Sequence, residues 1–269
     1  MTYFGFLLVF VCIPLLIMAL IAQRDRRANA LTLDPCAVCY AMALHIGLAL
    51  LYTTPWDNYL VATGVWYYNP ALVTGMVLGW VPIEEYTFFI VQTALAGFWW
   101  WFLARRLLPV AVFRASTGLR LAVMIFPAMT WLVSVALLAS GWKPATYFAL
   151  ECAWALIPIS IQLCFGADIL WHHRRLVVLT ILPLTFYLSL ADAFAIRAGI
   201  WTIAPGQSFN LFIGALPIEE LVFFMLTNTL IAFGITLLLA PESRARALTL
   251  KQRLNIGQSP IINSTHPKS

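Results

Sequence analysis

The chain has 269 residues, of which 62% are hydrophobic and only 10% are charged, and its formal net charge is +5. No ordinary soluble core needs so many apolar residues, so the composition excludes a soluble domain and predicts an integral membrane protein in a lipid bilayer. The positive charge does not indicate a nucleic-acid partner, because the basic residues sort by loop along the chain, as the positive-inside rule describes.

Seven apolar runs are long enough for a membrane-spanning helix, which needs about 20 mostly apolar residues. They cover about 3–22, 36–54, 83–104, 119–139, 146–166, 175–191 and 218–240. No basic region or small-residue cleavage site accompanies the first run, so we expect a retained helix and not a signal peptide. The predicted fold class is therefore all-α, with about seven transmembrane helices.

Arginines predict the orientation of these helices, because they gather after the first, third, fifth and seventh runs. Only Lys143 and Arg197 fall on the opposite side. The chain is therefore expected to cross the cell (cytoplasmic) membrane several times, with the N-terminus outside and the C-terminus inside. The polar tail, 242–269, is expected to be disordered on the cytoplasmic side.

Both halves of the chain contain one motif, VPIEEYTFF at 81–89 and LPIEELVFF at 216–224. Further residues align at the same shift of 135: Asp57 with Asp192, Gly64 with Gly199, and Trp66 with Trp201. Upstream, YFGFLLVFVCIP and YFALECAWALIP align from Tyr3 and Tyr147. The chain therefore contains an internal repeat, and each copy has three spans.

The fourth span has no counterpart, and it restores the orientation of the first repeat in the second. We therefore predict two parallel three-helix repeats, related by a pseudo-two-fold axis along the membrane normal. The first repeat covers 1–112, the connecting helix 113–141 and the second repeat 142–241.

Each copy of the motif places two adjacent glutamates in an apolar chain, Glu84 with Glu85 and Glu219 with Glu220. An ionisable side chain in a spanning helix costs at least about 2.5 kcal/mol, so it usually faces the protein interior and is functional. Capping of a helix start is the alternative, because acids commonly follow a proline there. Capping does not explain the short apolar stretch before each motif, which we expect to dip into the bilayer beside a protein cavity.

Aromatic rings share a helical stripe with these acids. One stripe holds Glu85, Phe88, Phe89 and Gln92, and its counterpart holds Glu220, Phe223, Phe224 and Thr227. A helix N-terminus favours the charged carboxylate, whereas desolvation and the neighbouring acid favour the neutral form, so one acid of each pair could be neutral at pH 7. A neutral acid can protonate a hydrocarbon, and aromatic faces stabilise the developing cation by about 0.5–2 kcal/mol each. The stripe therefore predicts acid/base chemistry without redox.

These residues resemble the membrane lycopene cyclases. The resemblance rests on the doubled PIEE with its following FF, on TPWDNYLVATGVWYY around Asp57 and Trp66, and on DAFAIRAGIW and FFMLTN. That family occurs as paired small subunits in actinobacteria, and as a fused chain in archaea, some bacteria and fungal cyclase/phytoene-synthase proteins. The resemblance covers nearly the whole chain before about residue 241, and the two copies resemble the fused form.

The resemblance implies carotenoid biosynthesis, in which the linear ψ-ends of lycopene close to β-ionone rings by protonation, carbocation closure and loss of a proton. It implies that the acid and base are Glu84, Glu85, Glu219 and Glu220, with a preference for Glu85 and Glu220 because their stripe carries the rings. The implied polar partners are Asp57, Asp192, Gln92 and Asn228. The implied cation-stabilising wall is Trp66, Phe88, Phe89, Trp201, Phe223 and Phe224.

The sequence contains no strong motif for binding a cofactor or a metal. No G-x-G-x-x-G follows a strand, so we predict no flavin or nicotinamide requirement, and we assign no metal site. The lone C-x-x-C at 36–39 is interpreted as small residues at a helix start. His172 and His173 stand beside arginines in a loop, and we interpret them as anchors at the membrane interface.

Two alternatives stay open at this point. A proton- or cation-coupled transporter with parallel repeats would also contain buried carboxylates, although its pathway should be lined by more polar residues than this chain offers. A cyclase acting on a fifty-carbon carotenoid is the other. The sequence also leaves open β, ε or γ rings, one closed end or two, which glutamate is acid and which base, and the oligomeric state.

Overall fold

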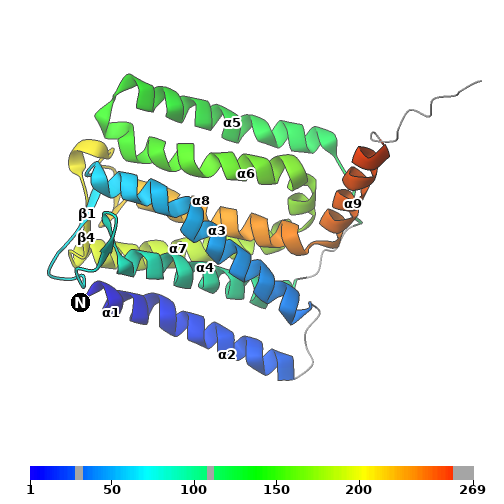
Figure 1. Ribbon diagram of the computed structural model, residues 1–269, viewed down its shortest axis with the longest axis horizontal. Coiled ribbons are helices and arrows are strands. Elements are labelled where there is room, and N and C mark those ends of the chain that lie inside the picture. The colour runs from blue at the N-terminus through cyan, green and yellow to red at the C-terminus, as the bar shows by residue number, and fades with distance from the viewer. Residues whose placement is uncertain (28–32, 108–111, 257–269) are drawn as a thin grey trace, which may run out of the picture.

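The computed structural model describes residues 1–27, 33–107 and 112–256. Long helices lie side by side, with short strands gathered at the end that carries the N-terminus and the last helix crossing the other end (Figure 1). Among the described residues, seven helical spans are long and apolar enough to cross a membrane, as the sequence predicts. The chain is therefore an all-α, multi-pass membrane protein.

The part of the chain before the connecting helix consists of two membrane-spanning segments, a short strand, a β-hairpin and a third spanning helix. They are α1 (Tyr3–Leu7), a π-helical turn (Leu8–Cys12), α2 (Ile13–Arg27), α3 (Pro35–Ala62), β1 (Trp66–Tyr68), β2 (Val77–Leu78), β3 (Val81–Pro82) and α4 (Ile83–Ala104). The later elements are α5 (Thr117–Ser140), α6 (Thr146–His172), α7 (Arg174–Arg197), β4 (Trp201–Ile203), β5 (Phe212–Ile213), β6 (Leu216–Pro217), α8 (Ile218–Leu239) and α9 (Pro241–Ile256), with 3-10 turns at Lys143–Ala145 and Pro205–Gln207. After α5, the order of the first part recurs.

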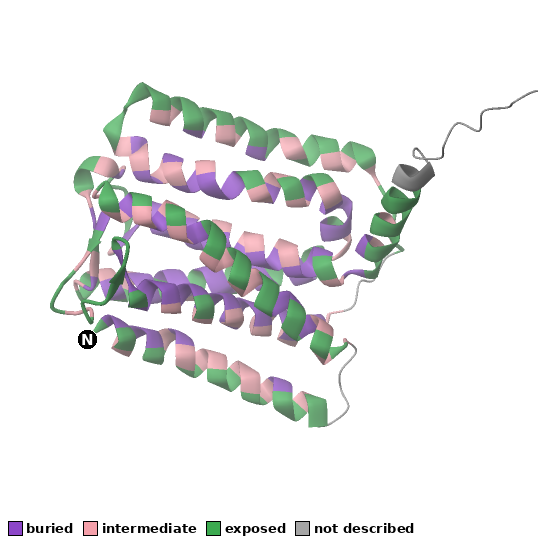
Figure 2. Ribbon diagram, viewed as in Figure 1, coloured by how far each residue is buried: buried purple, intermediate pink, exposed green. Residues whose placement is uncertain are grey.

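The helices α4 and α8 occupy the middle of the bundle. Each contacts the other, and each also contacts α3 and α7. The outer helices are α2, which packs on α4, and α5, which packs on α6. Figure 2 shows that α5 and α2 are mostly exposed or half-buried, whereas buried residues gather on α4 and α7. The two helices that begin with Glu-Glu are therefore shielded from the surroundings by the rest of the fold.

Several spans are longer than the sequence predicted, and two of them bear on the site. The helix α3 continues to Ala62 and α7 to Arg197, beyond the expected ends at 54 and 191. The interior Pro55 does not end α3. Asp57 and Asp192 therefore lie inside these helices, and both side chains are buried in the protein, which is where an acid in a spanning helix is tolerated.

The start of α3 explains the C-x-x-C segment. Asp34 caps the helix, because its carboxylate accepts hydrogen bonds from the backbone amides of Cys36 and Ala37. Pro35 occupies the first helical position, where its missing N–H costs nothing. Cys36 and Cys39 are free and exposed in this first turn, in keeping with a helix start.

One antiparallel strand pair joins the two parts of the chain. In the pairing of β1 with β4, Trp66 lies opposite Ile203 and Tyr68 opposite Trp201. The central partners, Tyr67 and Thr202, are equivalent positions of the two repeats at the shift of 135 residues. The equivalent strands of the two repeats therefore pair with each other, and their central residues lie opposite one another.

The apolar stretch before each glutamate pair folds into a β-hairpin. The strands β2 and β3 pair around Gly79, and β5 and β6 pair around Gly214, whose φ angles are 72° and 65°. Such positive φ values favour glycine in two-residue hairpin loops. Asn58 on α3 accepts a hydrogen bond from the backbone amide of Trp80 at 2.7 Å, so the first hairpin is tied to the bundle.

The tail differs from its expected disorder. Residues Pro241–Ile256 form the helix α9, which contacts α6 and α8, whereas 257–269 lie outside the described residues. Arg246 donates two hydrogen bonds to Asp168 of α6, at 2.8 and 2.6 Å. A polar composition therefore does not mean disorder here, because the charged side chains find partners on the bundle.

An ion pair joins α2 to the end of α4 and generates the first prediction. Arg105 Nη1 lies 2.8 Å from Asp25 Oδ2, and only 2% of the Arg105 side chain is exposed. Burial lowers the pKa of the Arg105 guanidinium, and Asp25 opposes that effect. We expect Asp25→Asn to reduce the free energy of unfolding by about 1–3 kcal/mol, because it leaves a buried charge without its counter-ion.

Denaturant unfolding of the protein in lipid bicelles measures this effect. The exposed Arg26 on the same helix turn provides the control, and Arg26→Gln should leave the unfolding midpoint unchanged. Equal midpoints for wild type and Asp25→Asn would contradict the prediction.

Candidate active site

The glutamate pairs occupy the first turns of the two central helices. Glu84 and Glu85 follow Pro82 at the start of α4, and Glu219 and Glu220 follow Pro217 at the start of α8. All four side chains are buried. A buried carboxylate needs hydrogen-bond donors, and the donors differ within each pair.

The first glutamate of each pair binds the backbone of the loop before it. Glu84 Oε1 accepts a hydrogen bond from the backbone amide of Thr74 at 2.6 Å. Glu219 Oε1 accepts one from the backbone amide of Phe209 at 2.7 Å and another from the Ser208 hydroxyl at 3.0 Å. Thr74 and Phe209 are equivalent positions at the shift of 135 residues. These two acids therefore hold the hairpin loops against the helix starts.

The second glutamate of each pair binds tyrosines. Glu85 Oε2 accepts hydrogen bonds from the phenols of Tyr3, at 2.5 Å, and Tyr68, at 3.0 Å. Glu220 Oε1 accepts one from the phenol of Tyr147 at 2.9 Å. Tyr3 and Tyr147 are the residues from which the upstream segments of the repeats align. Each of these glutamates is thus joined to the first helix of its own half.

Tyr68 lies in β1, outside the membrane-spanning helices. Burial, followed by the charges of Asp57 and Glu85, raises the pKa of its phenol well above the usual value. The phenol therefore keeps its proton at neutral pH and acts as a hydrogen-bond donor to Glu85. Its equivalent in the second half is Ile203, which has no donor, so Glu220 lacks this second partner.

Glu85 and Glu220 line the same cavity, which has a volume of about 40 Å³. Asp192 is the third acid in its wall. The aromatic residues that line it are Tyr3, Phe6, Trp66, Tyr68, Phe88, Trp201, Phe223 and Phe224. The cavity thus combines carboxylates with ring faces, as the helical stripes predict for this part of the chain.

Several rings of this wall pack edge to face with neighbouring rings. Trp66 meets Tyr147 at a centroid distance of 5.3 Å and an interplanar angle of 88°. Trp201 meets Phe6 at 5.3 Å and 87°. Such contacts add to area burial and fix the orientations of the rings around the cavity.

The two aspartates have different surroundings. Asp192 Oδ1 accepts a hydrogen bond from Trp201 Nε1 at 3.0 Å. Both oxygens of Asp57 are buried and have no hydrogen-bond partner among the described residues. Glu151 on α6 is likewise buried with no partner there, and it stands where the first repeat has Leu7.

A second cavity lies between α3, α4, α6 and α8. Its volume is about 250 Å³, and its lining is mostly apolar. Phe89 and Gln92 line this cavity and not the first, whereas Phe223 lines both. Gln92 Nε2 lies 3.5 Å from the Thr227 hydroxyl, its equivalent in the other half, and Asn228 instead donates to the Thr185 hydroxyl at 3.1 Å. The expected polar partners therefore do not share one cavity.

Sequence reasoning missed several residues of the site. The upstream segments of the two repeats align from Tyr3 and Tyr147, so the tyrosine that recurs at this position could have indicated a role in the site. Tyr68 gave no such signal, because the second half has isoleucine there. Trp154 packs face to face on Trp56 at 4.6 Å and was one apolar residue among many in its helix.

The loop-holding role of the first glutamate can be tested directly. We expect Glu84→Ala to raise the hydrogen-exchange rate of the Thr74 amide by roughly tenfold or more, because a hydrogen bond to a charged group contributes about 1.5–3 kcal/mol. Residue-resolved hydrogen–deuterium exchange in nanodiscs gives the rate. Glu85→Gln is the matched control, because Glu85 binds tyrosines and not this amide. The same rate in wild type and Glu84→Ala would refute the role.

Comparisons with known proteins identify relatives of the chain. It is 39% identical over 197 residues to a lycopene beta-cyclase of Halobacterium salinarum, which covers 71% of this chain and 79% of that protein. It is 32% identical over 193 residues to a bifunctional lycopene cyclase/phytoene synthase of Sporisorium reilianum, covering 68% of this chain and 28% of the fungal protein. A protein of the same name from Gibberella fujikuroi is 33% identical over 202 residues, covering 73% and 34%.

No known family profile matches the chain, and no solved structure matches it significantly. The archaeal match spans most of both proteins, whereas the fungal matches cover about a third of each fungal chain. The archaeal and fungal relatives share the cyclase name and more than two thirds of this chain. The chain therefore belongs to the family of the membrane lycopene cyclases.

Proposed function

We propose that this protein is a lycopene cyclase of carotenoid biosynthesis that closes the ψ-ends of lycopene to β-ionone rings. The observation that carries the proposal is the placement of Glu85 and Glu220 in one buried cavity walled by aromatic rings. The names of the relatives supply the substrate, and a cavity wall that is apolar and aromatic apart from its three acids suits a hydrocarbon. The transporter alternative gains no support, because the relatives named above are cyclases.

The proposed reaction is an isomerisation, which places the enzyme among intramolecular lyases or isomerases. An acid adds one proton to the terminal double bond of the ψ-end, and the resulting carbocation is attacked by a nearby double bond to close the ring. A base then removes one proton from the ring. The proton that is consumed balances the proton that is released, so no electron acceptor takes part. Aromatic faces stabilise the cation between the two proton transfers.

We assign the base to Glu85 and the acid to Glu220. Two phenols donate to Glu85, and hydrogen bonds donated to a carboxylate stabilise its charged form. Glu220 receives one phenol and has Ile203 where Glu85 has Tyr68. Glu84 and Glu219 serve as loop anchors in this proposal and do not touch the substrate.

The residues expected to stabilise the cation are divided between the two cavities. Trp66, Phe88, Trp201, Phe223 and Phe224 would face the cation, because they line the cavity of Glu85 and Glu220. Phe89 and Gln92 would contact the polyene chain in the second, apolar cavity. Asp57 and Asp192 remain polar neighbours of the acid and base.

The two halves of the site are proposed to be parallel repeats, 1–112 and 142–241, around a two-fold axis, with 113–141 as the connection. Equivalent residues meet at two points, in the β1–β4 pair and at Gln92 with Thr227. Equivalent hydrogen bonds join Tyr3 to Glu85 and Tyr147 to Glu220. One axis through the central helices accounts for all four contacts.

The proposed location is the cell membrane, with the N-terminus and the glutamate pairs toward the outside. Arginines gather at the opposite end of the bundle, near α9, as they do on the cytoplasmic side of membrane proteins. The substrate, a hydrocarbon, would reach the site from the bilayer.

Pigment analysis of lycopene-accumulating bacteria that contain no other cyclase tests the function. We expect the wild-type chain to yield cyclised carotenoid, and Glu85→Gln and Glu220→Gln to reduce the yield by at least about 10²-fold, the usual contribution of general acid–base catalysis. Lys143→Gln, which changes an exposed charge, controls for expression and insertion. Unchanged lycopene with a well-inserted wild-type protein would overturn the proposal.

Deuterium separates the acid from the base. Proteoliposomes incubated with lycopene in D₂O should incorporate deuterium into carotenoid with the Glu85→Gln protein, because protonation still occurs. The Glu220→Gln protein should incorporate none, because the donor is missing. Mass spectrometry of the recovered carotenoids reads both results, and the reverse pattern would exchange the two roles.

Filling the second cavity tests where the polyene lies. Ala49 on α3 lines this cavity, and we expect Ala49→Trp to lower cyclisation by at least roughly tenfold through displaced substrate. Ala43→Trp is the matched control, because Ala43 is exposed on the same helix. Wild-type activity in Ala49→Trp, measured by the same pigment analysis, would exclude this cavity from substrate binding.

A further inference from the structure

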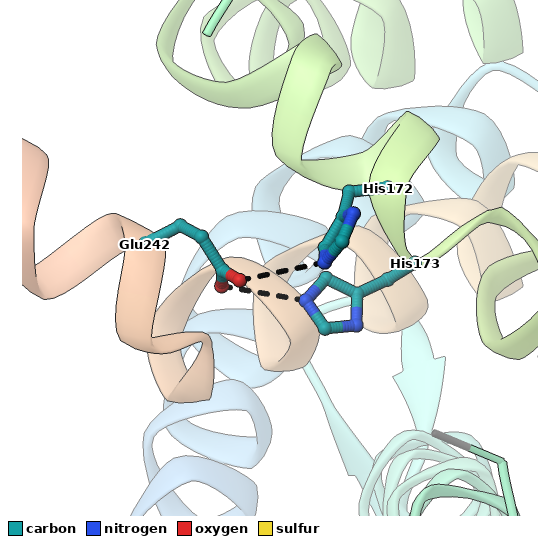
Figure 3. Close-up of side chains that lie close together, drawn as sticks. All are labelled: His172, His173 and Glu242. Atoms are coloured by element: carbon teal, nitrogen blue, oxygen red, sulfur yellow. Dashed lines mark hydrogen bonds and ion pairs between the residues drawn. The ribbon is translucent and has the colours of Figure 1, made fainter. Parts of the chain in front are cut away.

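Three metal-binding side chains converge at the end of the bundle away from the glutamate pairs. His172 is the last residue of α6, His173 lies between α6 and α7, and Glu242 lies in the first turn of α9. Figure 3 shows both imidazole rings turned toward the carboxylate of Glu242. One ligand atom from each residue lies within 4.8 Å of the other two.

The separations fit a metal ion better than direct hydrogen bonds. His172 Nε2 lies 3.6 Å from Glu242 Oε1, and His173 Nε2 lies 3.4 Å from Glu242 Oε2. A charge-assisted hydrogen bond between these groups would be about 2.7–2.9 Å long. Ligands about 2.0–2.1 Å from a tetrahedral Zn²⁺ are about 3.3–3.4 Å apart. Each imidazole lies near that spacing from the carboxylate oxygen that faces it, His172 from Oε1 and His173 from Oε2.

The surroundings favour bound ions. The side chains of His172, His173 and Glu242 are only 8%, 13% and 17% exposed. Phe113 covers His172 with a ring contact at 5.6 Å.

The site has an open side. Glu242 also lines a groove of about 980 Å³ between α6, α9 and the start of α5. Water can therefore reach the carboxylate from the groove and supply a fourth ligand. Two imidazoles and a carboxylate with one open position form a ligand set that suits zinc.

We propose that His172, His173 and Glu242 bind one Zn²⁺ ion that fastens the start of α9 to the turn between α6 and α7. The ion replaces two long polar contacts with three short bonds. It acts together with Arg246, one helical turn after Glu242, which binds Asp168 of α6. These two attachments hold one face of α9 on the bundle.

The sequence alone predicts no metal site, and its two adjacent histidines are typical of anchors at the membrane interface. The third ligand is 69 residues from His173 in the sequence, and no metal motif has that spacing. Two adjacent histidines within one helix would point in different directions. Here α6 ends at His172, and the turn at His173 lets both rings face the same point.

The full chain, purified in detergent without chelator or a polyhistidine tag, tests the proposal. Other ligands must be removed first, so the background carries Cys36→Ser, Cys39→Ser and His266→Ala. Elemental analysis should give one zinc per chain, and Co²⁺ added to metal-free protein should bind in a ratio of one with the absorption spectrum of a tetrahedral site.

Variants locate the ion. Glu242→Gln, and His172→Ala with His173→Ala, should each weaken Co²⁺ and Zn²⁺ binding at least about tenfold. His45→Ala is the control, because His45 lies in the middle of α3 and should not affect binding. Unchanged metal affinity in the Glu242→Gln protein and in the double histidine variant would overturn the proposal. So would less than one zinc ion per ten chains together with no tetrahedral Co²⁺ spectrum.

Proteolysis tests the fastening itself. Trypsin cleavage after Arg244 in α9 should slow at least about fivefold when Zn²⁺ is added to metal-free protein. The Glu242→Gln protein should be cleaved at one rate with and without Zn²⁺, and matching unfolding midpoints of the metal-free proteins would show that the variant is folded. A zinc-independent cleavage rate in the background protein would refute the fastening role.

Discussion

The four glutamates buried at the helix starts take their hydrogen-bond donors from within the protein, and this requirement arranges much of the fold. Glu84 and Glu219 take backbone donors from the loops before them, so each loop must return to the start of its helix. Glu85 and Glu220 take phenols from the first helix of each half. The hairpins, the helix starts and the tyrosines are therefore parts of one solution to a desolvation cost that hydrocarbon imposes.

Equivalent residues of the two halves line one cavity, and small differences between the halves would give the two acids the separate roles proposed for them. The pairing of β1 with β4 and the contact of Gln92 with Thr227 bring the halves together at equivalent positions. Tyr68 and Glu151 have apolar counterparts, Ile203 and Leu7. An enzyme that both donates and removes a proton needs unequal groups, and a symmetric pair of glutamates with equal partners would not supply them.

The sequence was sufficient for the features that depend on composition and repetition. Seven spans and the buried glutamate pairs could be predicted because acids and arginines are rare and stand out in an apolar chain. The division of labour within each pair could not, because it depends on which loop amide each oxygen reaches. Composition also misjudged α9, since the partners of Arg246 and Glu242 lie in helices distant in sequence.

Carboxylates gather at the two ends of the bundle, and the middle holds apolar packing with a few hydrogen bonds between neutral side chains, such as Gln92 with Thr227. One end holds the glutamates, tyrosines and hairpins, and the other holds the ion pairs of Asp25 and Asp168 together with His172, His173 and Glu242. Because no chain of polar contacts joins the ends among the described residues, loosening α9 should leave the distances around Glu85 and Glu220 unchanged. Ion binding and ring closure would then be separable properties, so loss of one is no evidence about the other.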